Sequence, residues 1–382
     1  MAITEKTTPA RYLLILIAVF IVMVVLYGRI DHTDQKYDAW DLHEYIDMAN
    51  SFPGPADHIA PPYAFRPLGP YLAGAIGLPD YWNFYILALA AGLAIVVTLY
   101  FLLISGGINP GAALAATTLY MFNKYAFGFF IWDYFQLTDI LGLLGLVLAV
   151  RTVFDGRWLL LALILILSIP ARATPFLIVP VVIVHLYIRG RPRQSWPAAL
   201  FSIFIPVILF VLFRLFWPVA EGPGLWDSFR LNAIKMASPG PWYGTLINAF
   251  APLALVPLVF RRQTAAFFRE RKSLLLLLIL IFTASLFGRD SERLMAPALV
   301  VFYYLLAFLF TTTGLRKMPV MIMILLLAFV GSIDFESGLV HWPDRTVSLA
   351  AGAILTILAV AVAIWSRLSA PDRNLFPNPD NN

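Results

Sequence analysis

Cysteine is absent from this sequence of 382 residues, and charged residues are scarce. The absence of cysteine excludes disulfide bonds and thiolate metal sites. Only 13% of the residues are Asp, Glu, Lys or Arg, whereas a soluble globular domain has about 25%. A chain with so few charges could not cover its own surface against water. The composition therefore predicts an integral membrane protein.

Apolar residues make up 60% of the sequence and are gathered in long runs. A helix needs about 20 such residues to cross the hydrocarbon core of a bilayer, so the runs predict an all-α, polytopic transmembrane bundle of about 12 spans. They would form a single transmembrane domain, residues 1–370, followed by a disordered cytoplasmic tail at 371–382. The expected spans are 12–30, 83–104, 111–130, 137–154, 157–170, 174–190, 197–217, 244–260, 273–288, 294–313, 318–334 and 346–366.

The charged residues are distributed unevenly between these runs. An even number of spans puts both termini on one side, and more than half of the 27 Lys and Arg residues fall on that side. Most of the 22 acidic residues fall elsewhere. Because Lys and Arg favour cytoplasmic loops, the pattern predicts cytoplasmic termini and an acidic outer face. The net charge of +5 follows from this topology, and no nucleic-acid partner is predicted.

The first outer loop, residues 31–82, is the longest and is expected to carry short juxtamembrane helices. From residue 38 onward, apolar side chains recur at i, i+4 and i+7, which predicts a helix lying on the membrane surface. Neighbouring carboxylates raise one another's proton affinity or bind a cation, so they suit a general base or a divalent metal site. The alternative is a solvated acidic loop that only helps to fix the topology. The carboxylates of this helix are Asp38, Asp41 and Glu44.

Arg66 lies where the same loop becomes apolar. The segment 67–78 that follows is too short to span a membrane, so we expect it to lie in the interface or to dip in and return. Pro67 favours an extended conformation at Arg66 and can itself begin a helix. A guanidinium at this position could hold a lipid phosphate, or it could pair with an acid of the loop.

Further charged residues lie at the outer ends of later spans. Asp139 falls just inside an apolar run, where a carboxylate is costly and usually functional, and Asp133 precedes it. Arg172 joins two spans and has no acidic neighbour in the sequence. The loop before the tenth span could form a phosphate clamp, or a salt-bridge cluster that ties two helix ends together. Its candidate residues are Arg289, Glu292 and Arg293.

Acids and arginines thus meet at the outer boundary from at least four separate loops, as expected of an enzyme acting on a lipid-linked phosphate. Residues 41–49 resemble the Asp-x3-Tyr-x3-Ala pattern of the GT-C superfamily of glycosyltransferases. Residues 65–72 resemble the juxtamembrane segment that follows this pattern, and 133–139 resemble the second acidic loop. The stretches 171–174 and 291–293 are similar to later outer-face motifs of the family.

The resemblance implies a GT-C-like fold and an enzyme of a bacterial inner membrane. Such an enzyme moves a sugar, with inversion, from a polyprenyl-phosphate donor to an acceptor hydroxyl at the extracytoplasmic face. Asp41 would be the catalytic base, with Asp38 and Glu44 as fallbacks. A Mg²⁺ or Mn²⁺ ion among the carboxylates is left open. The residues expected to bind the substrates are Arg66, Asp133, Asp139, Arg172, Arg289, Glu292 and Arg293.

The acceptor is not predicted by the resemblance. Many members of the family carry a soluble C-terminal domain that helps to hold the acceptor, whereas here the last expected span ends shortly before the sequence does. Acceptor recognition would then come from the outer loops or from a partner.

Two other functional classes remain open. A lipid or solute transporter, or a flippase, would place charged or broken-helix sites near the middle of the bilayer, often in repeated halves. Here the acids are concentrated in outer loops, and no internal repeat is detected. The third class is a non-catalytic subunit of a larger membrane assembly.

Overall fold

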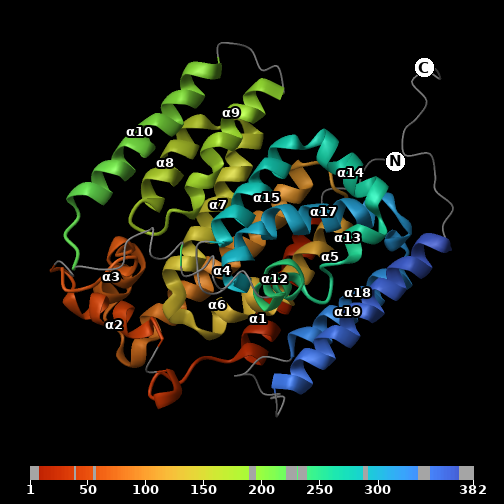
Figure 1. Ribbon diagram of the computed structural model, residues 1–382, viewed down its shortest axis with the longest axis horizontal. Coiled ribbons are helices and arrows are strands. Elements are labelled where there is room, and N and C mark those ends of the chain that lie inside the picture. The colour runs from red at the N-terminus through yellow and green to blue at the C-terminus, as the bar shows by residue number, and fades with distance from the viewer. Residues whose placement is uncertain are drawn as a thin grey trace.

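Every regular element in the described part of the chain is a helix. The helices lie side by side in one bundle (Figure 1). The predicted tail at 371–382 lies outside the described residues. The computed structural model describes residues 8–37, 40–54, 57–188, 195–220, 230, 239–286, 291–333 and 345–369.

Six helical segments in these residues are long and apolar enough to cross a membrane. An all-helical protein with several membrane-length helices is therefore confirmed, and the total of about 12 spans stays a prediction. The six segments are Ala10–Tyr27, Pro79–Ser105, Tyr134–Asp155, Ser195–Phe216, Glu292–Thr312 and Ala350–Leu368. Shorter apolar helices cover Trp158–Ser168, Thr174–Ile188, Lys272–Ser285 and Met318–Ser332.

The centre of the bundle consists of helices that are apolar on all sides. α4 (Trp82–Ser105) packs against α5 (Pro110–Met121) and α7 (Leu137–Asp155), and α17 (Leu299–Thr312) packs against α5. A helix without a polar face is stable inside a large protein or in a membrane. These four helices form the rigid core against which the polar residues described below are held.

Helices at the periphery bury only one face. α8 (Trp158–Ser168) packs against α10 (Ser195–Phe216), and both expose large apolar side chains. Leu159 is 86% exposed and Leu215 is 70% exposed. Such a surface would be unstable in water, and it matches the hydrocarbon of a bilayer. The other long helices are α1 (Thr8–Tyr27), α9 (Ile178–Ile188), α14 (Arg261–Glu270) and α15 (Lys272–Ser285).

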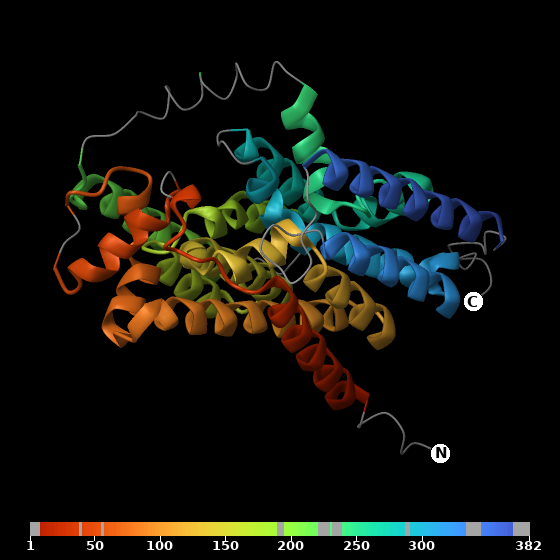
Figure 2. The same cartoon turned by 90° about the horizontal axis from the view of Figure 1, so that it is seen from below.

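The predicted first loop folds into two short helices at one end of the molecule. α2 (Leu42–Ser51) and α3 (Leu68–Ile76) lie together there, and α18 (Met318–Ser332) and α19 (Arg345–Leu368) lie at the opposite end (Figure 2). The apolar stripe predicted for α2 is confirmed, because its members are buried. They are Leu42, Ile46 and Ala49.

α2 and α3 are fixed to the rest of the bundle by close contacts. A Cβ atom at Gly74 would lie 2.3 Å from the carbonyl oxygen of Ala49, so only glycine allows the two helices to approach this closely. Asn83 Nδ2 donates to the carbonyl oxygen of Ala73 at 2.7 Å, and Leu68 N donates to that of Pro170 at 2.9 Å. The first loop is thereby tied to α4 and to the turn after α8.

The expected span 111–130 is not one continuous helix. α5 ends at Met121, and a π-helical turn (Lys124–Gly128) and α6 (Phe129–Trp132) follow. Asn123 causes the break, because its side-chain Oδ1 accepts from the backbone N–H groups of Tyr125 at 2.9 Å and Ala126 at 2.6 Å. An asparagine that bonds the backbone in this way competes with helical hydrogen bonds.

The expected span 244–260 is also interrupted. It contains the end of α12 (Pro239–Leu246), a 3₁₀ turn (Asn248–Phe250) and α13 (Val256–Val259). Pro252 and Pro257 lack the N–H group that a continuous helix needs, so the backbone turns between the short helices. Both interruptions pack against α16 (Ser291–Met295), which carries Arg293.

Asn123→Ala tests the first interruption. The change removes both capping hydrogen bonds and the bond from Asn123 Nδ2 to the carbonyl oxygen of Ala249 at 2.9 Å. Because the unpaired backbone groups would be buried, we expect a loss of about 1–3 kcal/mol in thermal unfolding of the detergent-solubilised protein. Asn109→Ala, which removes an exposed cap of α5, is the control and should cost about 1 kcal/mol or less. Equal losses would contradict a structural role for Asn123.

Candidate functional site

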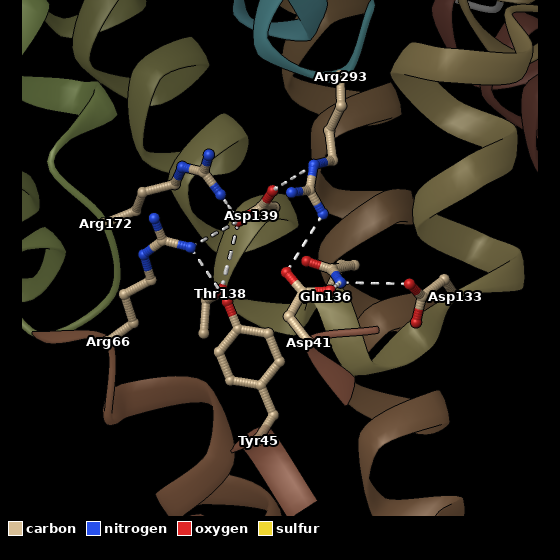
Figure 3. A network of polar contacts seen from close by, with 9 residues as sticks. All are labelled: Asp41, Tyr45, Arg66, Asp133, Gln136, Thr138, Asp139, Arg172 and Arg293. Carbon is tan, nitrogen blue, oxygen red and sulfur yellow. Dashed lines mark hydrogen bonds and ion pairs between the residues drawn. The ribbon is translucent and has the colours of Figure 1, made fainter. Parts of the chain in front are cut away.

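Three arginines from separate parts of the chain surround Asp139 (Figure 3). Asp139 lies in the first turn of α7, and its side chain is 3% exposed. Arg172, in the turn after α8, forms an ion pair with its Oδ1. Arg66 Nη1 is 3.9 Å from the same oxygen, and Arg293 Nε is 3.8 Å from Oδ2. A carboxylate at this depth requires such compensation.

Asp41 forms the second half of the cluster. It directly precedes α2, and its side chain is 11% exposed. Arg293 Nη1 donates to Asp41 Oδ2 at 3.4 Å, and Gln136 Nε2 donates to Asp41 Oδ1 at 2.6 Å. Arg293 therefore bridges Asp41 and Asp139 and holds the first loop against the start of α7 (Figure 3).

Tyr45 orients Arg66. It lies one turn beyond Asp41 in α2, and it is fully buried. Arg66 Nη1 donates to the Tyr45 hydroxyl oxygen at 3.0 Å, and Thr138 Oγ1 donates to the same atom at 3.2 Å. These bonds fix the guanidinium of Arg66 in the direction of Asp139 (Figure 3).

Two glycines make room for this arrangement. Gly142 lies one turn after Asp139, and a Cβ atom there would lie 2.9 Å from Cβ of Arg172. Residues three apart share one face of a helix, so the missing side chain lets Arg172 lie along α7 toward Asp139. Gly69 has the same effect in α3. A Cβ atom there would lie 3.1 Å from Cγ of Leu137, so the missing side chain lets α3 lie close to the start of α7.

Without Asp133, which lies behind it, the cluster carries an excess of positive charge. Three guanidiniums face two carboxylates, and the arginine side chains are only 14–19% exposed. Burial, together with the neighbouring charges of Arg66 and Arg293, lowers the pKa of Arg172. A bound anion would stabilise the charged form of these arginines, so the site favours a negatively charged ligand.

A small cavity of about 60 Å³ adjoins the cluster. Asp139, Arg172 and Arg293 supply its charged wall. A cavity needs about 10–15 Å³ on this measure to hold one water molecule, so this one can hold a small anionic group but not a whole lipid. The apolar walls include Phe130, Leu143, Leu177, Ile281, Leu294 and Pro297. The combination suits the junction between a charged head group and an apolar chain.

Asp133 lies behind this cluster and has no exposed surface. Gln136 Nε2 donates to Asp133 Oδ2 at 3.2 Å, in addition to its bond with Asp41. Burial and the charge of Asp41 raise the pKa of Asp133 to about 7. Asp133 is thus joined to the cluster through Gln136, and it does not line the cavity.

The remaining sequence candidates lie apart from the cluster. Glu44 is half-buried on α2 and has no ion pair within the described residues. Glu292 accepts a hydrogen bond from Asn248 Nδ2 at 3.3 Å, and its part in a phosphate clamp or a salt-bridge cluster stays a prediction. Asp38 and Arg289 lie outside the described residues. Within those residues, no three His, Asp or Glu side chains are placed to hold a metal ion.

Sequence analysis did not single out Gln136 and Thr138. Both stand in the stretch between Asp133 and Asp139, and both are buried. Uncharged polar residues carry little signal by themselves. Their position just before a buried carboxylate, at the start of an apolar helix, is the feature that could have identified them.

The chain matches no family model, no curated protein and no solved structure.

Asp139→Asn tests whether the buried charge balance holds the fold together. The change leaves three guanidiniums with one carboxylate, and we expect a loss of about 3–5 kcal/mol in unfolding free energy. Asp155→Asn is the matched control at the other end of α7. Asp155 is 23% exposed and lies 3.8 Å from both Arg151 and Arg157, so its loss should cost about 0–1 kcal/mol. Similar losses in the two variants would contradict the special role of Asp139.

Proposed function

We propose that this chain is a glycosyltransferase of the GT-C type. It moves a sugar from a polyprenyl-phosphate donor to an acceptor hydroxyl at the extracytoplasmic face of a bacterial inner membrane. Both termini then lie in the cytoplasm. The observation that carries the proposal is the excess of guanidinium groups around Asp41 and Asp139, beside a cavity with apolar walls.

The arginines would bind the phosphate of the donor. Guanidinium groups bind phosphate oxygens through paired N–H donors, and they stay charged when partly buried. In this proposal Arg172 and Arg293, which line the cavity, contact the phosphate. Arg66 adds positive charge, and the lipid chain leaves along the apolar wall.

Asp41 would be the catalytic base. Its carboxylate is 11% exposed and lies at the edge of the cluster, so an acceptor can reach it, whereas Asp139 is 3% exposed and is surrounded by arginines. Asp41 takes the proton of the acceptor hydroxyl, whose oxygen attacks the anomeric carbon from the side opposite the phosphate. A new glycosidic C–O bond forms as the bond to the phosphate breaks.

The leaving polyprenyl phosphate gains negative charge as this bond breaks. The arginines already face that position, so they stabilise the transition state more than the ground state. Asp41 and Asp139 are both paired with guanidiniums. A Mg²⁺ or Mn²⁺ ion among the carboxylates stays a prediction.

The Asp41→Asn variant tests the proposed base. We expect turnover to fall by about 10²–10⁴-fold, since the amide cannot accept the proton, and donor binding to be retained. The measurement is radiolabelled transfer by purified protein in proteoliposomes, with a panel of polyprenyl-phosphate sugars. Asp47→Asn, an exposed position on the same helix, is the matched control.

Unchanged turnover in Asp41→Asn would remove Asp41 from the mechanism. Wild-type protein that moves a lipid or solute across the vesicle membrane without transferring sugar would instead support a transporter. Wild-type protein with neither activity would support a non-catalytic subunit.

The Arg172→Lys variant tests phosphate binding. Lysine keeps the charge but loses the paired donors, so we expect the KM for the donor to rise about tenfold, equivalent to about 1.4 kcal/mol, with little change in kcat. Arg157→Lys, at the other end of α8, is the control. An unchanged KM would mean that Arg172 only neutralises Asp139.

A further inference from the structure

Two carboxylates share one buried amide in this protein. Gln136 Nε2 donates to Asp41 Oδ1 at 2.6 Å and to Asp133 Oδ2 at 3.2 Å (Figure 3). Asp41 is at the edge of the site, Gln136 is 1% exposed and Asp133 is 0% exposed. The three side chains form a line that runs from the partly exposed Asp41 into the interior.

At the inner end of this line, the hydrogen-bonding capacity of the side chains is only partly used. Asp133 Oδ1 and Gln136 Oε1 are buried and accept no hydrogen bond from the described residues. A buried acceptor without a partner costs free energy, and each such case calls for an explanation. Asp133 is 0% exposed, so contact with a substrate does not explain it.

The stability of the fold does not explain Asp133 either. Its folded pKa is raised from 3.8 to about 7, chiefly by burial and then by the charge of Asp41. The folded state therefore binds this proton more tightly than the unfolded state does. The contribution of Asp133 to stability is full below pH 3.8 and is lost as the pH rises through about 7. At neutral and higher pH, the buried carboxylate opposes folding.

We propose that Gln136 and Asp133 are positioning residues that orient the Asp41 carboxylate and strengthen it as a proton acceptor. This inference rests on the proposed function, in which Asp41 is the base. Gln136 holds Oδ1, so that the carboxylate plane is fixed while Oδ2 faces Arg293. Asp133 places a second negative charge behind the amide.

The sign of the effect follows from the charges that face Asp133. These are Asp41 from the start of α2 and Arg293 from α16, and the neighbouring Tyr134 is titratable but uncharged. When Asp133 is ionised, its charge disfavours the ionised form of Asp41, which makes Asp41 a better base. Arg293 acts in the opposite direction on both carboxylates. Protonation of Asp133 below neutral pH removes the strengthening effect.

Infrared spectroscopy tests the coupling without any substrate. The protonated-carboxyl stretch of purified full-length protein is titrated between about pH 4 and pH 9, spanning the ordinary Asp value and the raised one. Wild-type protein should show one carboxyl that titrates near pH 7, which is lost in Asp133→Asn. The band lost in Asp133→Asn should titrate at lower pH in the Asp41→Asn background, because the charge of Asp41 raises the pKa of Asp133. Identical titration of Asp133 with and without the Asp41 charge would overturn the inference.

Transfer kinetics test the consequence for catalysis. We expect Asp133→Asn to match wild-type kcat near pH 5.5, where Asp133 of the wild-type protein is protonated, and to fall below it, by at most about tenfold, near pH 8.5, where Asp133 is ionised. The KM for the donor should not change. Gln136→Met, which removes the amide, should lower kcat at both pH values with the same KM. Asp34→Asn, in the first loop, serves as the control.

A purely structural role gives a different result. It would lower the kcat of Asp133→Asn equally at both pH values, together with the melting temperature, and that outcome would overturn the inference. The proposed function and the positioning role of Gln136 and Asp133 can be rejected independently of each other. Coupled titration in a wild-type protein without transferase activity would reject the proposed function. Transferase activity without coupled titration would reject only the role of Gln136 and Asp133.

Discussion

The neutralisation of one buried carboxylate organises this molecule. Asp139 is 3% exposed at the start of α7, where an isolated negative charge would cost several kcal/mol. Its compensation comes from Arg66, Arg172 and Arg293, and each of these lies on a different element. The same requirement therefore draws the first loop, the α8 turn and α16 to one place. The fold and the candidate site share a single electrostatic cause.

The sequence was sufficient to predict the helices and the chemically costly positions. Apolar runs predicted an all-helical membrane protein. Asp139 and Arg172 stood out because a charged side chain in or beside such a run is energetically costly. The ends of elements were harder, because they depend on local geometry. Asn123 interrupts an apolar run through two side-chain hydrogen bonds, and asparagine in such a run has no unique meaning.

The pairing of charges could not be read from spacing. Arg293 stands next to Glu292, and the sequence left open a phosphate clamp or a local salt-bridge cluster. The guanidinium reaches Asp41 and Asp139, while Glu292 accepts a hydrogen bond from Asn248. Gln136 was missed because its importance lies in joining Asp41 to Asp133, and only the folded chain brings these side chains together. Tertiary proximity, and not residue type, assigns the partners.

The wide separation of these partners has a consequence for biosynthesis. Asp41 leaves the ribosome 252 residues before Arg293, an interval of roughly 10–50 s at common rates of translation. Asp139 and Arg172 can pair early, because they belong to the consecutive helices α7 and α8 and the turn that follows. Asp41 has no partner from α16 at that stage, but it lies at the edge of the bundle, where water can solvate it. The deeper charge is thus matched first. The ion pair between Asp41 and Arg293 forms only after α16 has been synthesised. Completion of the site is therefore a late step in maturation.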